Sequence, residues 1–194
     1  SFEALDNKKY TLQNNMCAIS DKSGVLGLGG IIGGTRSGTE FSTKNILLES
    51  AYFFPSSTRK TSKILNIDTD AKYRFERGID PDSIKLGLEL GMCMILDMCG
   101  GEPSKFSIVG KIKDERKVID LEPEQFSKVI GFSITSAEIK RILFSLGCSL
   151  RMSGKKMKVL PPTWRPDIKE DIDLIEELTR IKGYDKVPLI NPEK

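Results

Sequence analysis

Histidine is absent from this 194-residue chain. Without it, neither a Ser–His nor a Cys–His nucleophile can be built, so catalysis would depend on carboxylates, lysine, backbone groups, water or residues from elsewhere. The four cysteines, Cys17, Cys93, Cys99 and Cys148, include no C-x-x-C pair. This spacing and the missing histidine exclude the usual zinc ligand sets. We interpret the cysteines as buried free thiols in a reducing compartment.

Long apolar runs are also absent. No stretch of about 18 apolar residues exists and no signal peptide opens the chain, so we expect a cytoplasmic protein that does not cross a membrane. The net charge of +3 gives no strong attraction to nucleic acid as a whole. Apolar residues make up 39% and charged residues 29%, as in globular proteins. Because the chain starts at Ser1 rather than methionine, we expect a piece of a longer protein.

The first half of the chain reads as a mixed α/β region. Its patterns predict strands at 16–20 and 45–54, an apolar glycine-rich run at 25–34, and helices at 55–66 and 81–99. The segment Thr69–Pro81 is dense in hydrogen-bonding side chains and is predicted to be an ordered loop or short helix. A polar stretch at 111–117 marks a boundary, and we assign residues 1–113 to the first domain.

A smaller domain is predicted at 114–190. The order strand, helix, helix, strand, strand, helix is typical of a winged-helix-like domain. Thr135 and Glu138 form a capping-box pattern at the start of its second helix, and the last helix is predicted at 168–182. The fold class expected for the whole chain is therefore α+β.

Two features of the first domain fit either a pocket or a purely structural role. The glycine run lacks both nucleotide-loop patterns, because Ile32 and Thr35 stand where glycine and lysine would be needed. Its glycines must instead serve close backbone approach or positive φ. Glu49 lies in the most apolar predicted strand, where a carboxylate is costly unless it is paired or faces a ligand. Partners available for pairing are Arg59, Arg74 and Arg77.

The last helix begins with an unusual density of acids. Six carboxylates and one lysine lie between Asp167 and Glu177. Asp167 and Glu170 have the spacing of a helix cap, which accounts for acids in the first turn. Three acids further along, Asp173, Glu176 and Glu177, share one helix face with no basic partner at matching spacing. Oxygen donors in this arrangement indicate a site for a hard cation such as magnesium, or a docking surface.

Several long strings together resemble one family. They are GIIGG, NILLESAYFFPSSTRKT, TDAKYRFERGIDP and PPTWRPDIKEDIDLIEELTRIKGYDKVP. In this order they are similar to the beta subunit of bacterial phenylalanyl-tRNA synthetase across essentially the whole chain. The resemblance implies that residues 1–113 are the later part of the editing domain and that residues 114–190 are the winged-helix-like fifth domain.

The resemblance implies a function in an (αβ)2 assembly that joins phenylalanine to tRNA(Phe) using ATP. Synthesis takes place in the alpha subunit, so ATP is not bound by this fragment. The beta subunit hydrolyses tyrosine wrongly attached to the tRNA, and the residues implied in that editing pocket are Gly33, Glu49, Thr69 and Ala71. Glu49 would recognise the tyrosine hydroxyl, which fits the need for a polar group to detect an added hydroxyl.

The chain departs from the family pattern at one point. The family's editing pocket uses a histidine earlier in the domain, and this chain has none. We therefore assign no catalytic residue within the fragment and expect the isolated fragment to be inactive. The resemblance also implies a magnesium site shared with the alpha subunit. Its ligands would be Asp167, Asp173, Glu176 and Glu177.

Two alternatives remain open. One is a winged-helix module that binds nucleic acid by itself, through Lys140 and Arg141 on its second helix and the lysines of the following hairpin. These cations are few for phosphate neutralisation, where several contacts are usual. The other is a structural module, without catalysis, whose acids dock a partner protein.

Overall fold

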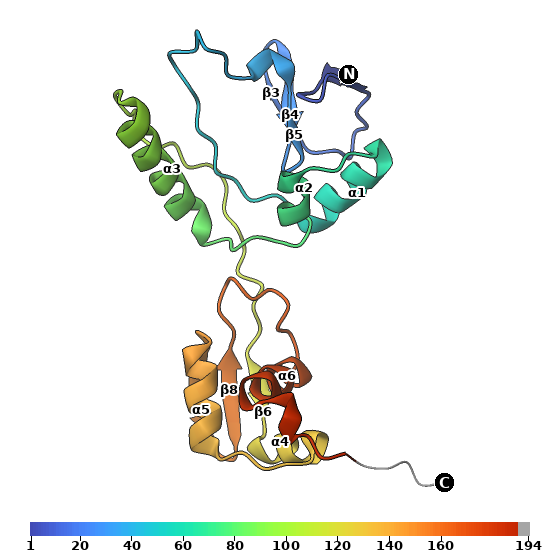
Figure 1. The fold of residues 1–194 in the computed structure, drawn as a ribbon, viewed down its shortest axis with the longest axis vertical. Helices are drawn as coiled ribbons and strands as arrows, with labels where there is room; N and C mark the ends of the chain where they lie inside the picture. Colours follow the sequence, from blue (N-terminus) through green and yellow to red (C-terminus); the bar gives the residue numbers. More distant parts are fainter. Residues whose placement is uncertain (190–194) are drawn as a thin grey trace. The chain divides into compact units, whose positions relative to one another are not determined.

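The computed structural model of the protein describes residues 1–189. The chain forms two compact units, Ser1–Ile112 and a second unit that begins at Lys113 (Figure 1). Each unit combines helices with antiparallel sheet, which confirms the α+β class. The expected domain boundary between residues 113 and 114 lies beside this division. Residue 190, the expected end of the second domain, lies outside the described residues.

The first unit contains two small antiparallel sheets. Their strands are β1 (Phe2–Glu3) with β2 (Lys9–Tyr10), and β3 (Ala18–Asp21), β4 (Gly24–Leu28) and β5 (Ile32–Gly33) in that order. A bridge between Ala4 and Gly34 joins the two sheets, and a short 3-10 helix η1 (Thr35–Ser37) follows. The buried core of this unit includes Phe2, Ala4 and Leu28. The strand predicted at 16–20 begins two residues later, because the Met16 N–H donates to Gln13 in a turn.

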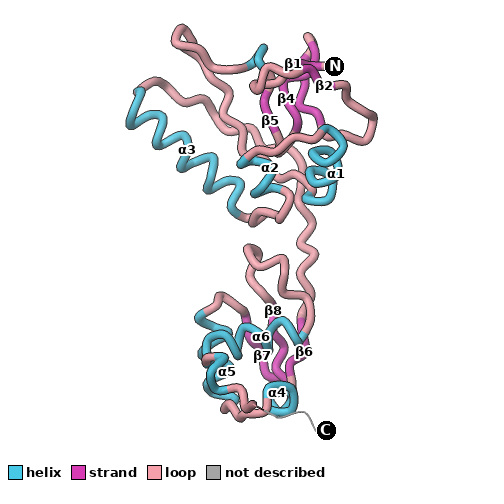
Figure 2. The backbone as a smooth tube through the Cα atoms, turned by 45° about the vertical axis from the view of Figure 1, so that its right-hand side comes forward, coloured by secondary structure: helices cyan, strands magenta, loops and turns pink. Residues whose placement is uncertain are grey.

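Three helices complete the first unit (Figure 2). They are α1 (Pro55–Leu65), α2 (Asp70–Phe75) and α3 (Ser83–Cys99). Proline at the first position starts α1, and Asn66 ends it in the left-handed conformation at φ 51°. Gly100, at φ 70°, ends α3. The two longer helices therefore lie where the sequence predicted them.

The strand predicted at 45–54 is wrong. This segment is a loop, and residues 45–53 make no backbone hydrogen bond to another segment of the described chain. Several of its apolar side chains are exposed, Leu47 almost completely. Apolar composition favours burial, but it forms a strand only where a neighbouring strand offers an edge. Here β5, one of the two outer strands of its sheet, is only two residues long.

The second unit has the predicted element order (Figure 1). The elements are β6 (Ile119–Leu121), α4 (Pro123–Ile130), α5 (Ser136–Ser145), β7 (Ser149–Ser153), β8 (Lys156–Leu160), α6 (Asp171–Lys182) and the 3-10 helix η2 (Tyr184–Lys186). The strands form one antiparallel sheet in the order β6-β8-β7. Gly154, at φ 63°, supplies the tight turn between β7 and β8.

One apolar core holds the second unit together. Phe126, Leu143, Met157 and Leu174, from α4, α5, β8 and α6, are among its fully buried side chains. The predicted capping box is confirmed: the Glu138 N–H donates to Thr135 Oγ1 over 3.2 Å, and the Thr135 N–H donates to Glu138 Oε2 over 3.1 Å. Glu138 also accepts from Lys182 Nζ at 2.7 Å, which ties α5 to α6.

Within residues 1–189, every helix is too short or too polar to cross a bilayer. The interpretation of the cysteines as buried holds for Cys148 only, since Cys17, Cys93 and Cys99 are exposed. Burial raises the pKa of the Cys148 thiol, which keeps it protonated and unreactive.

Candidate functional site

The glycines between β4 and β5 allow an aromatic pair to approach the backbone. A Cβ atom at Gly29 would lie 2.5 Å from the Phe53 ring, and one at Gly30, where φ is 68°, would lie 3.0 Å from Phe75. The two rings meet edge to face with centroids 5.2 Å apart. Close approach and positive φ, the meaning predicted for these glycines, are both confirmed.

A hydrogen bond brings two segments of the predicted pocket together. Thr69 Oγ1 donates to the Ile31 carbonyl oxygen at 2.7 Å and accepts from the Lys72 N–H at 3.1 Å. The first bond fixes the start of α2 to the β4–β5 turn, two residues before Gly33. Ala71 lies in the first turn of the same helix. Three of the four predicted pocket residues therefore sit on two segments that this bond joins.

Glu49 does not lie in a buried strand as expected. It is exposed, and within the described chain it makes no hydrogen bond or ion pair. The arginines that could neutralise it, Arg59, Arg74 and Arg77, do not pair with it; Arg59, for example, donates to the Glu76 carbonyl oxygen at 3.0 Å. The carboxylate of Glu49 is consequently open to an external hydrogen-bond donor.

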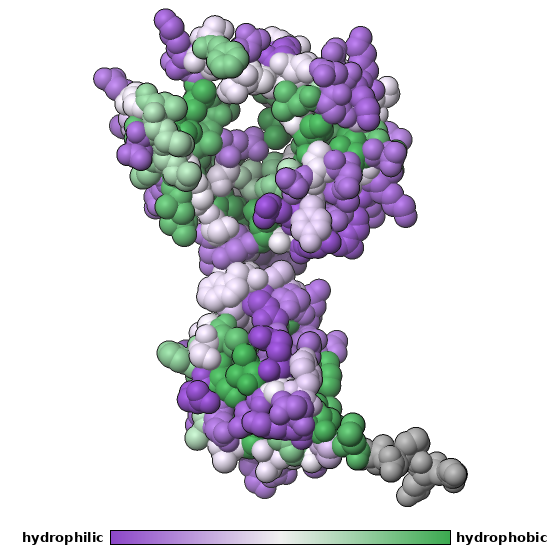
Figure 3. All heavy atoms as spheres, viewed as in Figure 1, coloured by the Kyte–Doolittle hydropathy of each residue, from purple (hydrophilic) through white to green (hydrophobic). Residues whose placement is uncertain are grey.

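The residues on both sides of Glu49 attach the loop to α3. Ser50 Oγ donates to the Ile84 carbonyl oxygen at 2.8 Å, and the Leu48 side chain packs over Gly91 of α3. Further along, Phe53 packs on Gly29. The loop therefore runs from α3 to the β4–β5 turn, and the surface between them is hollowed, with apolar atoms along α3 (Figure 3).

The acids at the start of α6 are not free of basic partners as expected. Arg165 Nη2 donates to Asp167 Oδ2 at 2.6 Å and to Glu177 Oε1 at 2.7 Å. Arg180 donates to the second oxygen of Glu177, which is only 6% exposed. Hydrogen bonding from Arg165 lowers the pKa of both carboxyl groups below their ordinary values. Glu177 is thus a buried carboxylate at the centre of an ion-pair network whose other members are partly exposed.

Asp173 caps the backbone at the start of α6. Its Oδ2 accepts from the N–H groups of Lys169 at 2.8 Å and Glu170 at 2.9 Å. The helix begins at Asp171 rather than at residue 168, and the predicted cap by Asp167 with Glu170 is wrong because Asp167 binds Arg165. Among these acids, Glu176 is exposed and makes no contact of this kind within the described residues.

The four predicted magnesium ligands do not gather around one point. Across residues 1–189, no group of three or more acidic, cysteine or histidine side chains is placed to hold a metal ion. Two of the ligands are occupied by arginine and one by backbone N–H groups, so in this arrangement they do not fit a magnesium ion, which needs an octahedral set of oxygens. The spacing of Glu177 and Arg180, three residues apart, was a sequence signal for this pairing.

Comparison with known families matches a domain family to each of the two units. The model of the B3/4 domain matches residues 1–100, and the chain belongs to this family. The model of the tRNA synthetase B5 domain matches residues 119–184, from β6 to η2. The strings that carried the resemblance therefore fall in two adjacent domains, in the expected order.

The chain is similar to proteins named phenylalanine–tRNA ligase beta subunit. It is 45% identical to that of Rhodospirillum rubrum over 188 residues, which cover 96% of this chain and 24% of the relative. It is 40% identical to those of Nitrobacter winogradskyi over 189 residues (97% and 23%) and Mesorhizobium japonicum over 184 residues (95% and 23%). The chain spans about a quarter of the length of these curated relatives. The resemblance to the bacterial beta subunit is confirmed.

Proposed function

We propose that the chain is part of the beta subunit of a phenylalanine–tRNA ligase and acts in the cytoplasm within an (αβ)2 enzyme. The main support is the 45% identity that extends over 96% of the chain. The two domain matches, in order, agree with it. In the assembled enzyme ATP and phenylalanine would react in the alpha subunit, and this region would act on tRNA(Phe) after charging.

The proposed role of the first unit is to edit tyrosyl-tRNA(Phe). Gly33, Thr69 and Ala71 would line the pocket, and Glu49 would accept a hydrogen bond from the tyrosine hydroxyl. The exposed, unpaired carboxylate of Glu49 and the bond from Thr69 to the turn before Gly33 support this assignment. A polar recognition group is needed because an apolar pocket separates side chains that differ by one hydroxyl only weakly.

The magnesium site shared with the alpha subunit remains a prediction, and the contacts that its four residues make do not support it. The resemblance implies a site completed by the alpha subunit at Asp167, Asp173, Glu176 and Glu177. In the unit described here, Arg165 already neutralises two of these acids. A cation at this place would have to displace that guanidinium group.

The function can be tested by replacing Glu49 with alanine in the full-length beta subunit, assembled with its alpha subunit. We expect hydrolysis of tyrosyl-tRNA(Phe) to fall by roughly ten- to a hundredfold, because one charged hydrogen bond contributes on the order of 1.5–3 kcal/mol. Charging with phenylalanine should be unchanged. Glu40→Ala, an exposed acid earlier in the same loop, is the matched control.

The outcomes separate two parts of the proposal. An assembled wild-type enzyme that does not charge tRNA(Phe) would refute the ligase assignment. Normal charging with undiminished hydrolysis in Glu49→Ala would refute the role of Glu49 and leave the ligase assignment in place.

A further inference from the structure

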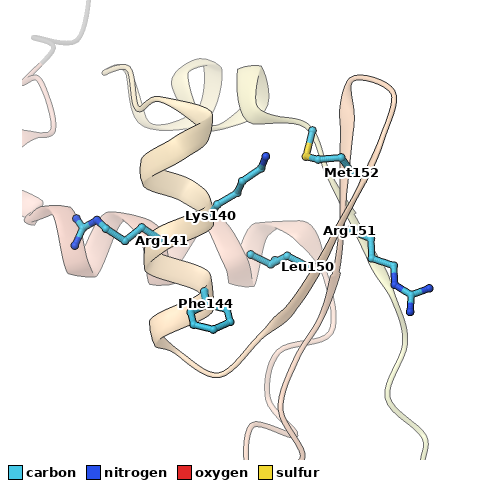
Figure 4. A pocket seen from close by; sticks show the side chains of 6 residues that line it. All are labelled: Lys140, Arg141, Phe144, Leu150, Arg151 and Met152. Carbon is cyan, nitrogen blue, oxygen red and sulfur yellow. The ribbon is translucent and has the colours of Figure 1, made fainter.

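The second unit has a groove between α5 and β7 with an apolar floor. Its volume is about 400 Å³, and it is lined by Lys140, Arg141, Phe144, Leu150, Arg151 and Met152 (Figure 4). We call it the α5–β7 groove. Phe144 is 76% exposed and Met152 is 49% exposed, although Leu150 packs against the core. Large apolar side chains on the rim of a polar-bordered groove are typical of an interaction site.

The strand beside this groove has an open edge. β7 is the last strand of the sheet, and Ser149–Ser153 make no backbone hydrogen bond outside the sheet in the described part of the chain. An open edge presents unpaired N–H and C=O groups, which another extended segment can use. Proteins usually protect such edges with proline, inward-pointing charges or a covering segment. Within the described residues β7 contains no proline, its one charged residue is Arg151, and α5 packs against it without pairing with its backbone.

The rows of side chains across the sheet show what would fit at this edge. On the core face, two rows end in apolar groups: Ile119, Val159 and Leu150 form one, and Leu121, Met157 and Met152 form the other. Between them, on the opposite face, the row is Asp120, Lys158 and Arg151. The pattern at the open edge is thus apolar, basic, apolar.

In the row Asp120, Lys158 and Arg151, the positive charges outnumber the negative charge, and the excess lies at Arg151 on the open edge. Lys158 Nζ lies 3.9 Å from Asp120 Oδ1, so its charge is neutralised on one side. Arg151 stands opposite Lys158 with no ion pair in the described chain, and like charges in facing positions are destabilising. Its side chain points away from α5, whereas Lys140 reaches across the groove toward Met152 (Figure 4). The next position outward from Arg151 would therefore favour an acid.

We propose that β7 binds an extended acidic segment of a partner protein as a fourth strand of the sheet. An acid of that segment would lie beside Arg151. The apolar residues on either side of it would enter the α5–β7 groove next to Leu150 and Met152, against Phe144. Strand addition of this kind draws affinity from main-chain hydrogen bonds and specificity from the pockets for alternate side chains.

A protein segment fits this surface better than a nucleic acid. The hairpin lysines Lys156 and Lys158 are engaged by Glu122, at 3.1 Å, and by Asp120. Arg141 lines the groove, but its guanidinium group points away from β7 (Figure 4). The cations near the groove without an ion pair in the described chain are Lys140, Arg141, Arg151 and Lys155, which are few for phosphate neutralisation, where several contacts are usual. The open strand edge also provides hydrogen bonds that an extended peptide can match in register.

The proposal can be tested with the 194-residue chain and pools of synthetic peptides. One pool has eight residues, with glutamate or aspartate alternating with valine, isoleucine, leucine or phenylalanine. The second pool has lysine in place of the acids. We expect binding of the acidic pool only, with slower amide hydrogen exchange confined to Ser149–Ser153. Phe144→Ala and Arg151→Glu should each weaken binding by about tenfold, and Lys155→Glu, at the hairpin tip outside the groove, should not change it.

Several results would contradict the proposal, and each can be told apart from the expected one. Equal binding of the two pools, or no binding of the acidic pool, would overturn the proposal. It would also be overturned by unchanged exchange in β7 on binding. Tighter binding of a 20-nucleotide single-stranded DNA, with a steep salt dependence and loss in Arg151→Glu, would assign the groove to nucleic acid instead.

Discussion

Replacing Glu177 with glutamine tests whether the acid cluster stabilises the second unit or strains it. The glutamate accepts from Arg165 and Arg180 with its two oxygens, and it is 6% exposed. Glutamine keeps the shape, but it removes the charge and turns an amide N–H group toward one arginine. The variant therefore loses the ion-pair network with little change in packing.

The size of the expected loss in stability depends on how far the two arginine partners of Glu177 are exposed to solvent. A hydrogen bond to a charged group contributes on the order of 1.5–3 kcal/mol where it is shielded from water. The side chains of Arg165 and Arg180 are 26% and 46% exposed, so solvent screening reduces both contributions. We expect a net loss of about 2 kcal/mol in the free energy of unfolding, or roughly 8–16 °C in Tm for a unit of this size.

Thermal melts of the 194-residue chain at neutral pH would measure this loss, with Glu176→Gln as the control. Glu176 is the adjacent acid on the same helix, but it is exposed and has no such partner in the described chain, so its replacement should leave Tm nearly unchanged. The pKa of Glu177 is lowered from 4.5, so its stabilisation is present above that pH and is lost as the pH falls through the lowered pKa. The two variants should therefore converge in acid. An increase of Tm in both would refute the network and indicate unrelieved repulsion among the acids.

Two further predictions concern caps in the same unit. Asp173→Ala should lower the free energy of unfolding by about 1 kcal/mol, because the two N–H groups at the start of α6 lose their acceptor, and hydrogen exchange at Lys169 and Glu170 should accelerate. The bond from Lys182 lowers the pKa of Glu138 from 4.5 to about 2, so its stabilisation is complete above pH 4.5 and is lost as the pH falls toward 2. Melts between pH 5 and 2 should show a smaller pH dependence in Glu138→Gln, and an identical slope would contradict this reasoning.

Local signals predicted much of the fold. Pro55 and Asn66 bound α1, and the capping box of Thr135 and Glu138 starts α5, because these residues act on backbone groups within one turn. The loop at 45–54 was not predictable in the same way. Its apolar composition indicates contact with something, but whether a strand edge is available depends on the rest of the fold.

The site was predicted less completely for the same reason. Resemblance implied a pocket at Gly33, Thr69 and Ala71, which stays a prediction, and the bond from Thr69 to Ile31 joins the two segments that carry these residues. Burial of Glu49 was inferred from its apolar neighbours and proved wrong. The partner of Glu177 in the loop before α6, Arg165, is 12 residues away in sequence, a distance that no local rule covers.

The acids before and within α6 are tolerated for separate reasons. Asp167 and Glu177 bind Arg165, Asp173 accepts from two backbone N–H groups, and Asp171 accepts from Gln125. Each of these carboxylates therefore has a donor within the unit. An ion bound to Asp167 or Glu177 would have to compete with Arg165, whose pKa is raised by the same contacts and which stays charged at all relevant pH values. A cation-dependent role of the cluster therefore requires a partner surface that draws Arg165 away from Glu177.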